Sequence, residues 1–184
     1  DRPRRITATY YAEWVLGVNR DEMQQYIIPE YVNEHHALLA RNPYNDEFAE
    51  RVAFLTATQP AHGLTSNRTE FLGVRGRRNQ PAALKRIGLS NSVEAGVDPC
   101  AAYMVHFDLQ AGESRQVHFL LGQGANREES LTLIKRYQDL AQVDEAWQQA
   151  RGNWQELLTT IQVETPEPAF DLLLNRWLLY QNLA

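Results

Sequence analysis

The sequence predicts a mainly β protein that ends in α-helices, with an antiparallel β-sandwich as its first and larger part. Short segments of alternating apolar and polar residues recur as far as residue 121, and turn signals rather than helices separate them. Beyond residue 124 the apolar residues recur every three or four positions, as they do on one face of a helix. The composition is that of a folded globular chain, because 43% of the 184 residues are hydrophobic.

The predicted strands are short and are separated by turns rich in Gly, Pro and Asn. They cover residues 6–16, 25–32, 37–41, 50–58, 101–109 and 117–121. Pro29 cannot donate to a ladder of hydrogen bonds, so its strand is expected at a sheet edge or at a bulge. The turn around Gly112 predicts that the last two strands form a hairpin.

Three helical segments follow the strands. Residues 127–141 have one apolar face, and residues 143–161 repeat apolar residues in a heptad pattern that fits either a helix packed on its own sandwich or a short coiled coil. Gly152 interrupts that helix, and close packing is the expected reason. Thr165 is the expected cap of a third helix, which is apolar nearly all round and is therefore expected to be buried in a larger assembly.

Composition and charge exclude several classes of protein. A net charge of -5 and a pI near 5.5 argue against nucleic-acid binding. The single cysteine, Cys100, excludes an internal disulfide framework and fits a reducing, cytoplasmic compartment. No apolar run approaches the ~20 residues that span a bilayer, so direct membrane insertion is not expected. The chain opens in a strand pattern without an initiator methionine, and we expect it to be a piece of a longer protein.

The most unusual stretch is residues 67–102, a basic loop that is expected to start as a short strand and to end where another strand begins. Between Asn67 and Gly88 it carries six cations against the single acid Glu70; the cations are Arg68, Arg75, Arg77, Arg78, Lys85 and Arg86. Two interpretations remain open. The loop either meets an anionic partner, or it is a solvated loop whose arginines pair with nearby carboxylates.

Other motifs point to no catalytic centre. The sequence Gly-Gln-Gly-Ala-Asn-Arg at 122–127 lacks the third glycine and the parallel βαβ unit of a dinucleotide site. The adjacent His35 and His36 are joined by no other candidate metal ligands. Cys100 opens an apolar strand and is expected to be a buried, inert thiol.

Five ordered motifs nevertheless resemble a known family. They are Arg-Thr-Glu-Phe-Leu-Gly at 68–73, Gln-Pro-Ala-Ala-Leu at 80–84, Gly-Val-Asp-Pro-Cys-Ala-Ala at 96–102, Phe-Leu-Leu-Gly at 119–122 and Asn-Arg-Trp-Leu-Leu-Tyr-Gln at 175–181. In this order they resemble the phosphorylase-like region of cyclic β-1,2-glucan synthases, which belongs to glycoside hydrolase family 94, the cellobiose phosphorylase group. Val74 departs from the pattern, because the family has arginine there and this chain has Arg75 one place later.

The resemblance implies a domain organisation. Residues 1–126 would be part of a larger β-supersandwich, residues 127–163 a helical linker, and residues 164–184 the first helix of a catalytic (α/α)6 barrel. It also implies that the catalytic aspartic acid and most phosphate-binding residues lie beyond residue 184. This chain is therefore expected to have no catalytic residue and no activity by itself.

The reaction that the resemblance implies is inverting phosphorolysis of β-1,2-glucan. An aspartic acid protonates the glycosidic oxygen while phosphate attacks the anomeric carbon from the opposite face. Inorganic phosphate is a co-substrate, and no cofactor or metal is implied. In a synthase this reaction would set the glucan length before cyclisation. The implied partners are the glucan, phosphate and the rest of the parent chain, on the cytoplasmic side of an inner-membrane synthase or in a soluble phosphorylase, and a homodimer is left open.

Within the basic loop, four side chains are expected to face the substrate or phosphate: Arg68, Glu70, Arg75 and Arg77. The alternative is a free-standing carbohydrate-binding or assembly module in which Trp14 or Tyr103 stacks on sugar rings. For both aromatic residues a place in the core is favoured, because they lie in register with apolar strand positions.

Overall fold

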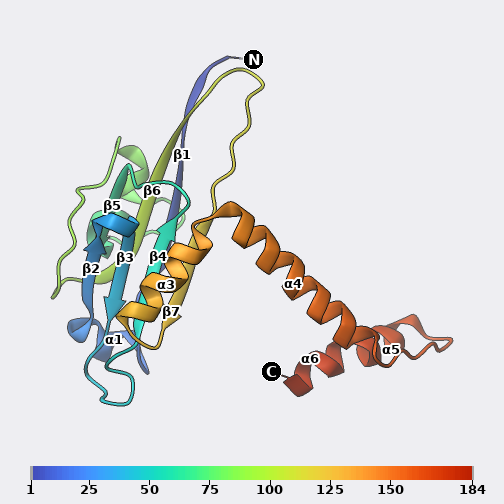
Figure 1. The fold of residues 1–184 in the computed structure, drawn as a ribbon. Coiled ribbons are helices and arrows are strands. Elements are labelled where there is room, and N and C mark those ends of the chain that lie inside the picture. Colours follow the sequence, from blue (N-terminus) through green and yellow to red (C-terminus); the bar gives the residue numbers. More distant parts are fainter. Residues whose placement is uncertain (1, 184) are drawn as a thin grey trace. The chain divides into compact units, whose positions relative to one another are not determined.

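A computed structural model describes residues 2–183. The chain forms two compact units, of which the first ends at Leu140 and the second begins at Ala141. The first unit contains two antiparallel sheets (Figure 1). One sheet has the order β1 (Arg4–Glu13), β6 (Pro99–Leu109), β5 (Gly63–Asn67). The other has the order β2 (Ile28–Val32), β3 (Ala37–Arg41), β4 (Val52–Ala57), β7 (Phe119–Gly124). The predicted antiparallel β-sandwich is confirmed.

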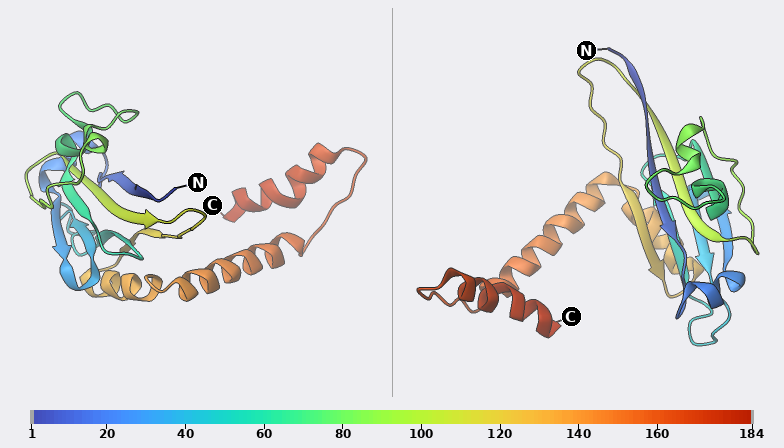
Figure 2. Two further views of the ribbon diagram at one scale, coloured as in Figure 1. Left: turned by 90° about the horizontal axis from the view of Figure 1, so that it is seen from above. Right: turned by 180° about the vertical axis from the view of Figure 1, so that it is seen from behind.

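The main core lies between the two sheets and follows the period of two. From β6 it takes Tyr103, Val105 and Phe107, and from the other sheet Leu38 and Leu55. Along β1 and β6 the pairing runs from Arg4 opposite Leu109 to Glu13 opposite Cys100, and this pair projects beyond β5 (Figure 2). β6 is the central strand of its sheet, and its residues 99–105 are all buried.

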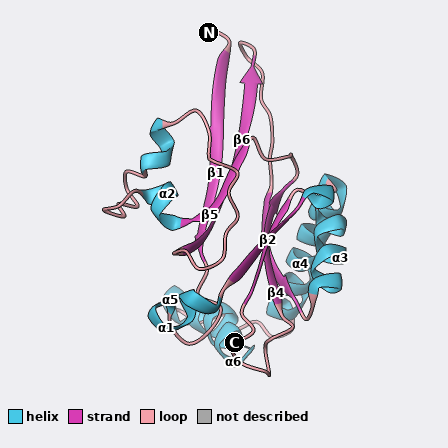
Figure 3. Ribbon diagram, turned by 90° about the vertical axis from the view of Figure 1, so that its left-hand side faces the viewer, coloured by secondary structure: helices cyan, strands magenta, loops and turns pink. Residues whose placement is uncertain are grey.

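Helices cover the outer faces of both sheets (Figure 3). On the first sheet, α2 (Arg68–Leu72) and η3 (Ala82–Lys85) bury Phe71 and Ala83 against Met104 of β6. On the second sheet, α3 (Arg127–Tyr137) buries Ile134 against Phe54 of β4. The first unit therefore has four layers, with a separate apolar cluster beneath each helical layer.

The predicted hairpin between residues 101–109 and 117–121 is wrong. β6 is paired on one side by β1 and on the other by β5, so it has no free edge for β7. The chain turns at Gly112, whose φ is +79°, but residues 110–118 then cross to the second sheet, where β7 pairs with β4. A turn signal shows that the chain reverses, but it does not show which strand the chain meets next.

Several element boundaries differ from the prediction for local reasons. β1 ends at Glu13, since Trp14 turns into the core and Leu16 adopts a left-handed φ of +39°. The predicted turn at 17–21 leads into a short helix α1 (Arg20–Met23), capped by the Asn19 side chain. The short 3-10 helices η1 (Gln24–Tyr26) and η2 (Asn33–His35) flank β2.

Two other expectations fare differently. Pro29 does lie on an edge strand, because β2 is the outermost strand of its sheet. In contrast, residues 67–102 do not begin as a strand. Asn67 ends β5, and its side chain accepts hydrogen bonds from the Thr69 and Glu70 amides, so the chain enters helix α2 at once.

The second unit is helical. It comprises α4 (Leu140–Thr159), α5 (Pro168–Leu172), the π-helical turn η4 (Leu173–Trp177) and α6 (Leu178–Leu183). The cap of α5 is Glu167, whereas Thr165, the expected cap, donates its hydroxyl to Asp171 instead. A side chain added at Gly152 would touch nothing within 4 Å, so packing within the described chain does not explain this glycine.

Many large apolar side chains of this unit are exposed in the described chain, and others are partly buried. Leu172 is 62% and Trp177 57% exposed, although Tyr180 lies against Trp154 at a ring separation of 6.3 Å. None of the described helices is long and apolar enough to cross a membrane.

Candidate functional site

A cluster of charged side chains lies at the base of the basic loop, around the carboxylate of Glu13 at the end of β1. Arg68 Nε donates to Glu13 Oε1 at 3.2 Å, and Arg78 donates through Nε at 3.1 Å and Nη2 at 2.9 Å. The hydroxyl of Tyr11 donates to the same carboxylate at 2.9 Å. Two arginines of the loop are therefore held by one acid from the strand beneath it.

Asp98, just before β6, is the second acid of the cluster. Its Oδ2 accepts from Arg68 Nη1 at 3.3 Å, and Arg20 of α1 contacts both Asp98 and Glu13. The side chains of Glu13, Arg20, Arg68 and Asp98 are at most 27% exposed, so their charges are partly screened from water. Three guanidinium groups face two carboxylates, which leaves the cluster with one excess positive charge.

The electrostatics of the cluster keep its acid ionised. Burial disfavours the charged form of Glu13, but hydrogen bonds from Arg78, Tyr11 and Arg68 outweigh burial and lower the pKa of this carboxyl to about 2. Burial, together with the hydrogen bond to Glu13, raises the pKa of the Tyr11 phenol. Glu13 is thus an ion-pair acceptor and cannot act as a proton donor near neutral pH.

The structure uses two of the four predicted site residues in contacts within the chain. Arg68 bridges the two acids of the cluster. Glu70 accepts hydrogen bonds from the Ser90 amide at 2.8 Å and the Ser90 hydroxyl at 2.7 Å, and it lies 3.7 Å from Arg86. These contacts hold Ser90 and Arg86, in the second half of the loop, against α2. That either side chain faces a ligand stays a prediction.

The other two predicted residues, Arg75 and Arg77, are exposed on either side of Gly76. No hydrogen bond or ion pair of their side chains is found within the described residues 2–183. Gly76 has a φ of +54°, and a Cβ there would lie 3.3 Å from the Arg68 guanidinium. The loop therefore separates its cations into those that hold it in place and those that remain available to solvent or a ligand.

Three residues weighed from the sequence are core residues. Trp14 is 5% exposed and Tyr103 is fully buried, so neither can stack on a sugar in this structure. Cys100 is buried as expected, and burial, followed by the charges of Glu13 and Glu70, raises the pKa of its thiol to about 12. The predicted burial of this thiol is confirmed.

The glycine motif at 122–127 has a structural function. β7 is antiparallel to β4, so the parallel unit of a dinucleotide site is lacking here. The Asn126 side chain caps α3, and Ser130 donates to the Val52 carbonyl at 2.8 Å. Among the described residues there is also no group of three or more His, Cys, Asp or Glu that could hold a metal ion.

Every carboxyl group with a clearly shifted pKa has a lowered pKa. Where the pKa of a carboxyl group shifts clearly, it moves below the ordinary value; these groups are Glu13, Glu30, Glu70, Asp108 and Glu113. A general acid that works near neutral pH needs the opposite shift. None of these five carboxyl groups is suited to protonate a leaving group.

Sequence reasoning missed most of the charged cluster. Asp98 is far from Glu13 and Arg20 in the chain, and no spacing rule connects the three residues. The available signal was the excess of arginine in the loop, which indicated either an anionic partner or nearby carboxylates.

The four-layered sandwich defines a class of β-sandwich domain, and comparisons with known proteins identify its family. The model of the family described as "Glycosyl hydrolase 94, supersandwich domain" matches residues 1–140. The chain belongs to this family. The matched range ends where the first compact unit ends, so it includes α3 together with the two sheets.

The curated relatives include a synthase and several phosphorylases. Over 182 residues the chain is 33% identical to the cyclic beta-(1,2)-glucan synthase NdvB of Rhizobium meliloti, a match that covers 98% of this chain and 6% of the synthase. It is 31% identical over 186 residues to an N,N'-diacetylchitobiose phosphorylase of Vibrio furnissii, covering 98% of this chain and 23% of that enzyme. A solabiose phosphorylase of Paenibacillus borealis is 24% identical over 185 residues, covering 99% and 24%. The chain thus spans less than a quarter of each of these relatives.

Proposed function

We propose that this chain is the non-catalytic sandwich part of a phosphorylase-type module that cleaves β-1,2-glucan with phosphate. The observation that carries the proposal is the combination of family membership with a candidate site whose acids, Glu13 and Glu70, have lowered pKa values. Such a domain supports a reaction whose proton donor lies elsewhere in the parent protein. The synthase relative favours β-1,2-glucan as the substrate, and in that setting phosphorolysis would set the chain length before cyclisation.

The reaction of the parent is an inverting displacement. A phosphate oxygen forms a bond to the anomeric carbon as the β-glycosidic bond breaks, and a carboxylic acid of the parent transfers its proton to the departing oxygen. The products are an α-glucosyl phosphate and a glucan shortened by one unit. Phosphate is the only co-substrate in this scheme.

The contribution of this chain is a rigid platform with a basic loop. The Glu13 cluster and the Glu70–Ser90 contacts hold the loop against the first sheet, while Arg75 and Arg77 stay exposed. We assign these two arginines to attraction of phosphate or of the phosphorylated product. The parent is expected in the cytoplasm, either as a soluble enzyme or as a cytoplasmic part of an inner-membrane synthase.

The test compares this chain with a longer protein that continues through the barrel. The longer protein should release glucosyl phosphate from β-1,2-glucan, whereas residues 1–184 alone should release none. Turnover by residues 1–184 would show that the proton donor lies in this chain and would refute the proposal.

Variants of the longer protein test the loop separately. Replacing both Arg75 and Arg77 by Ala should raise the KM for phosphate by about tenfold with little change in kcat. Arg5→Ala, which alters another exposed arginine of the same unit, is the matched control. Equal kinetics of the double variant and the control would remove the loop from the proposed site.

A further inference from the structure

A second site lies at one end of the sandwich, in a pocket of about 690 Å³ that involves no residue of the charged cluster. Its walls come from the segment between β1 and α1, from the segment between β3 and β4, and from β7. Two strands of the second sheet, β4 and β7, contribute Ala53 and Gln123 to it, and all of its residues belong to the first unit. The volume lies within the range of about 300–1,000 Å³ of small-molecule sites.

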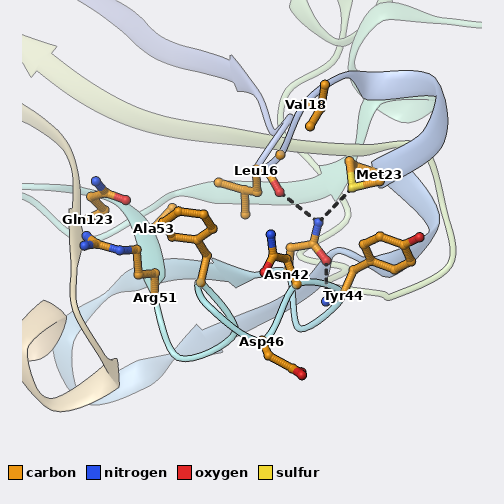
Figure 4. A pocket seen from close by; sticks show the side chains of 12 residues that line it. Leu16, Val18, Met23, Asn42, Tyr44, Asp46, Arg51, Ala53 and Gln123 are labelled. Carbon is orange, nitrogen blue, oxygen red and sulfur yellow. Dashed lines mark hydrogen bonds between the residues drawn. The ribbon is translucent and has the colours of Figure 1, made fainter.

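The floor of the pocket is built around the buried side chain of Asn42 (Figure 4). Asn42 Nδ2 donates to the Leu16 carbonyl at 2.8 Å, and Asn42 Oδ1 accepts from the Tyr44 amide at 3.0 Å. The first bond holds Leu16 in its left-handed conformation, and the second starts the turn that carries Tyr44. One side chain thus fixes two opposing segments of the pocket.

Two aromatic rings of the pocket remain open to solvent. Tyr44 is 59% and Phe48 47% exposed. Tyr44 is supported from behind by Tyr26, at a ring separation of 4.4 Å, so its position is fixed although its face is exposed. Exposed, supported aromatic faces offer flat apolar surfaces to a ligand at a low cost in side-chain entropy.

Three polar side chains of the pocket, Asp46, Arg51 and Gln123, make no hydrogen bond or ion pair within the described residues, and the two charges among them are opposite. Arg51 and Gln123 lie together on one side, with Tyr44 on the other (Figure 4). The side chains of Asp46 and Gln123 have no hydrogen bond within the described residues, and Arg51 has only a contact with the Phe48 ring at 5.9 Å. One carboxylate and one guanidinium cancel, so the pocket favours a neutral ligand that both donates and accepts hydrogen bonds.

From this lining we infer that the pocket is a binding site for a β-linked oligosaccharide, separate from the place of phosphorolysis. In a β-linked glucopyranose the ring substituents are equatorial. The ring therefore presents axial C–H bonds to an aromatic plane and hydroxyl groups to the sides. Tyr44 and Phe48 offer the planes, while Asp46, Arg51 and Gln123 offer acceptors and donors for hydroxyl groups. The choice of β-1,2-glucan as the first ligand rests on the proposed function, but the preference for pyranose rings rests on these side chains.

The experiment titrates residues 1–184 with β-1,2-linked glucotetraose, cellotetraose and chitotetraose, followed by amide chemical shifts. At least one ligand should bind with a Kd of about 1 mM and shift amides of residues 42–51. Phe48→Ala and Arg51→Ala should each weaken binding by about tenfold. Phe170→Ala, which removes a ring of similar exposure, 49%, from the other unit, should leave binding unchanged.

Each outcome decides the inference. Absence of binding by all three ligands, or binding that Phe48→Ala and Arg51→Ala leave unchanged, would overturn it. Each variant should keep the wild-type amide spectrum away from the substituted residue. Such a spectrum shows that the variant is folded and that weaker binding is not caused by unfolding. Because this titration needs no turnover, binding without phosphorolysis by the longer protein would refute only the proposed function, and phosphorolysis without this binding would refute only the pocket.

Discussion

Replacing Glu13 by Gln should destabilise the sandwich, because the substitution removes the acid that holds Arg68 and Arg78. The pKa of Glu13 falls from an ordinary value of 4.5 to about 2, and at about 1.4 kcal/mol per pKa unit this corresponds to roughly 3 kcal/mol. The Arg78 side chain is 73% exposed, so solvent screening reduces this value, and we expect a loss of about 1–2 kcal/mol. Arg20 and Arg68 would then share only Asp98, and Arg78 would lose its ion pair.

The effect should depend on pH in a defined direction. Glu13 has a lowered pKa in the folded state, so its stabilisation is complete above about pH 4.5 and is lost as the pH falls towards 2. Glu13→Gln should therefore be less stable than the wild type at pH 7 but similar to it near pH 2. Within this interval the variant should lose less stability than the wild type, because it lacks the share of Glu13 and keeps that of the other acids with lowered pKa values.

Hydrogen exchange of the paired amides of β1 and β6 is the suitable assay, since it reports on the first unit and not on the helices beyond Leu140. Asp108→Asn is the matched control. It breaks an ion pair with Arg5 in which both side chains are about two-thirds exposed, and it should change exchange much less. If Glu13→Gln left exchange at pH 7 as in the wild type, the cluster would not stabilise the sandwich, and the reasoning would be wrong.

Three further predictions concern single positions. In Gly122→Ala the new Cβ would lie 2.6 Å from the buried Phe54 ring, so thermal unfolding should show a loss of about 1–3 kcal/mol, and an unchanged midpoint would contradict the packing. Cys100 should resist a thiol reagent at pH 8 in the folded chain and react fully in denaturant, because it is buried and its pKa is raised to about 12; rapid labelling of the native protein would contradict this. Asn126→Ala removes the cap that accepts a hydrogen bond from the Glu129 amide. Hydrogen exchange of α3 should become faster, because the free energy of opening this helix should fall by about 1 kcal/mol. Unchanged exchange would show that the cap is dispensable.

The parts of the fold that were predictable from the sequence depend on local patterns. β3 was predicted with its observed bounds, because Leu38 and Ala40 face the core between two clear turn signals. The edge position of β2 followed from Pro29 alone. The pairing of β6 could not be read in this way, since Ala102 and Met104 on its second face are buried beneath α2 by residues distant in the chain.

The candidate site was predictable only in outline. The excess of arginine in residues 67–102 indicated either a ligand or buried acidic partners, and the structure contains such partners for Arg68 and Arg78. Their positions depend on contacts that bring residues 13, 20 and 98 together, and these contacts follow from sheet pairing rather than from sequence spacing. The pocket around Asn42 was missed for the same reason, since its turn signal does not show that Tyr44 and Phe48 stay exposed.

The most direct test of the central claim is the anomeric form of the first product that the longer protein makes from β-1,2-glucan and phosphate. Phosphorus and proton NMR of the reaction at early times identify it. The account predicts α-glucosyl phosphate and a glucan one unit shorter, because phosphate attacks opposite the leaving oxygen. Free glucose without a phosphate ester, or a β-glucosyl phosphate, would contradict the assignment of this sandwich to an inverting phosphorylase module.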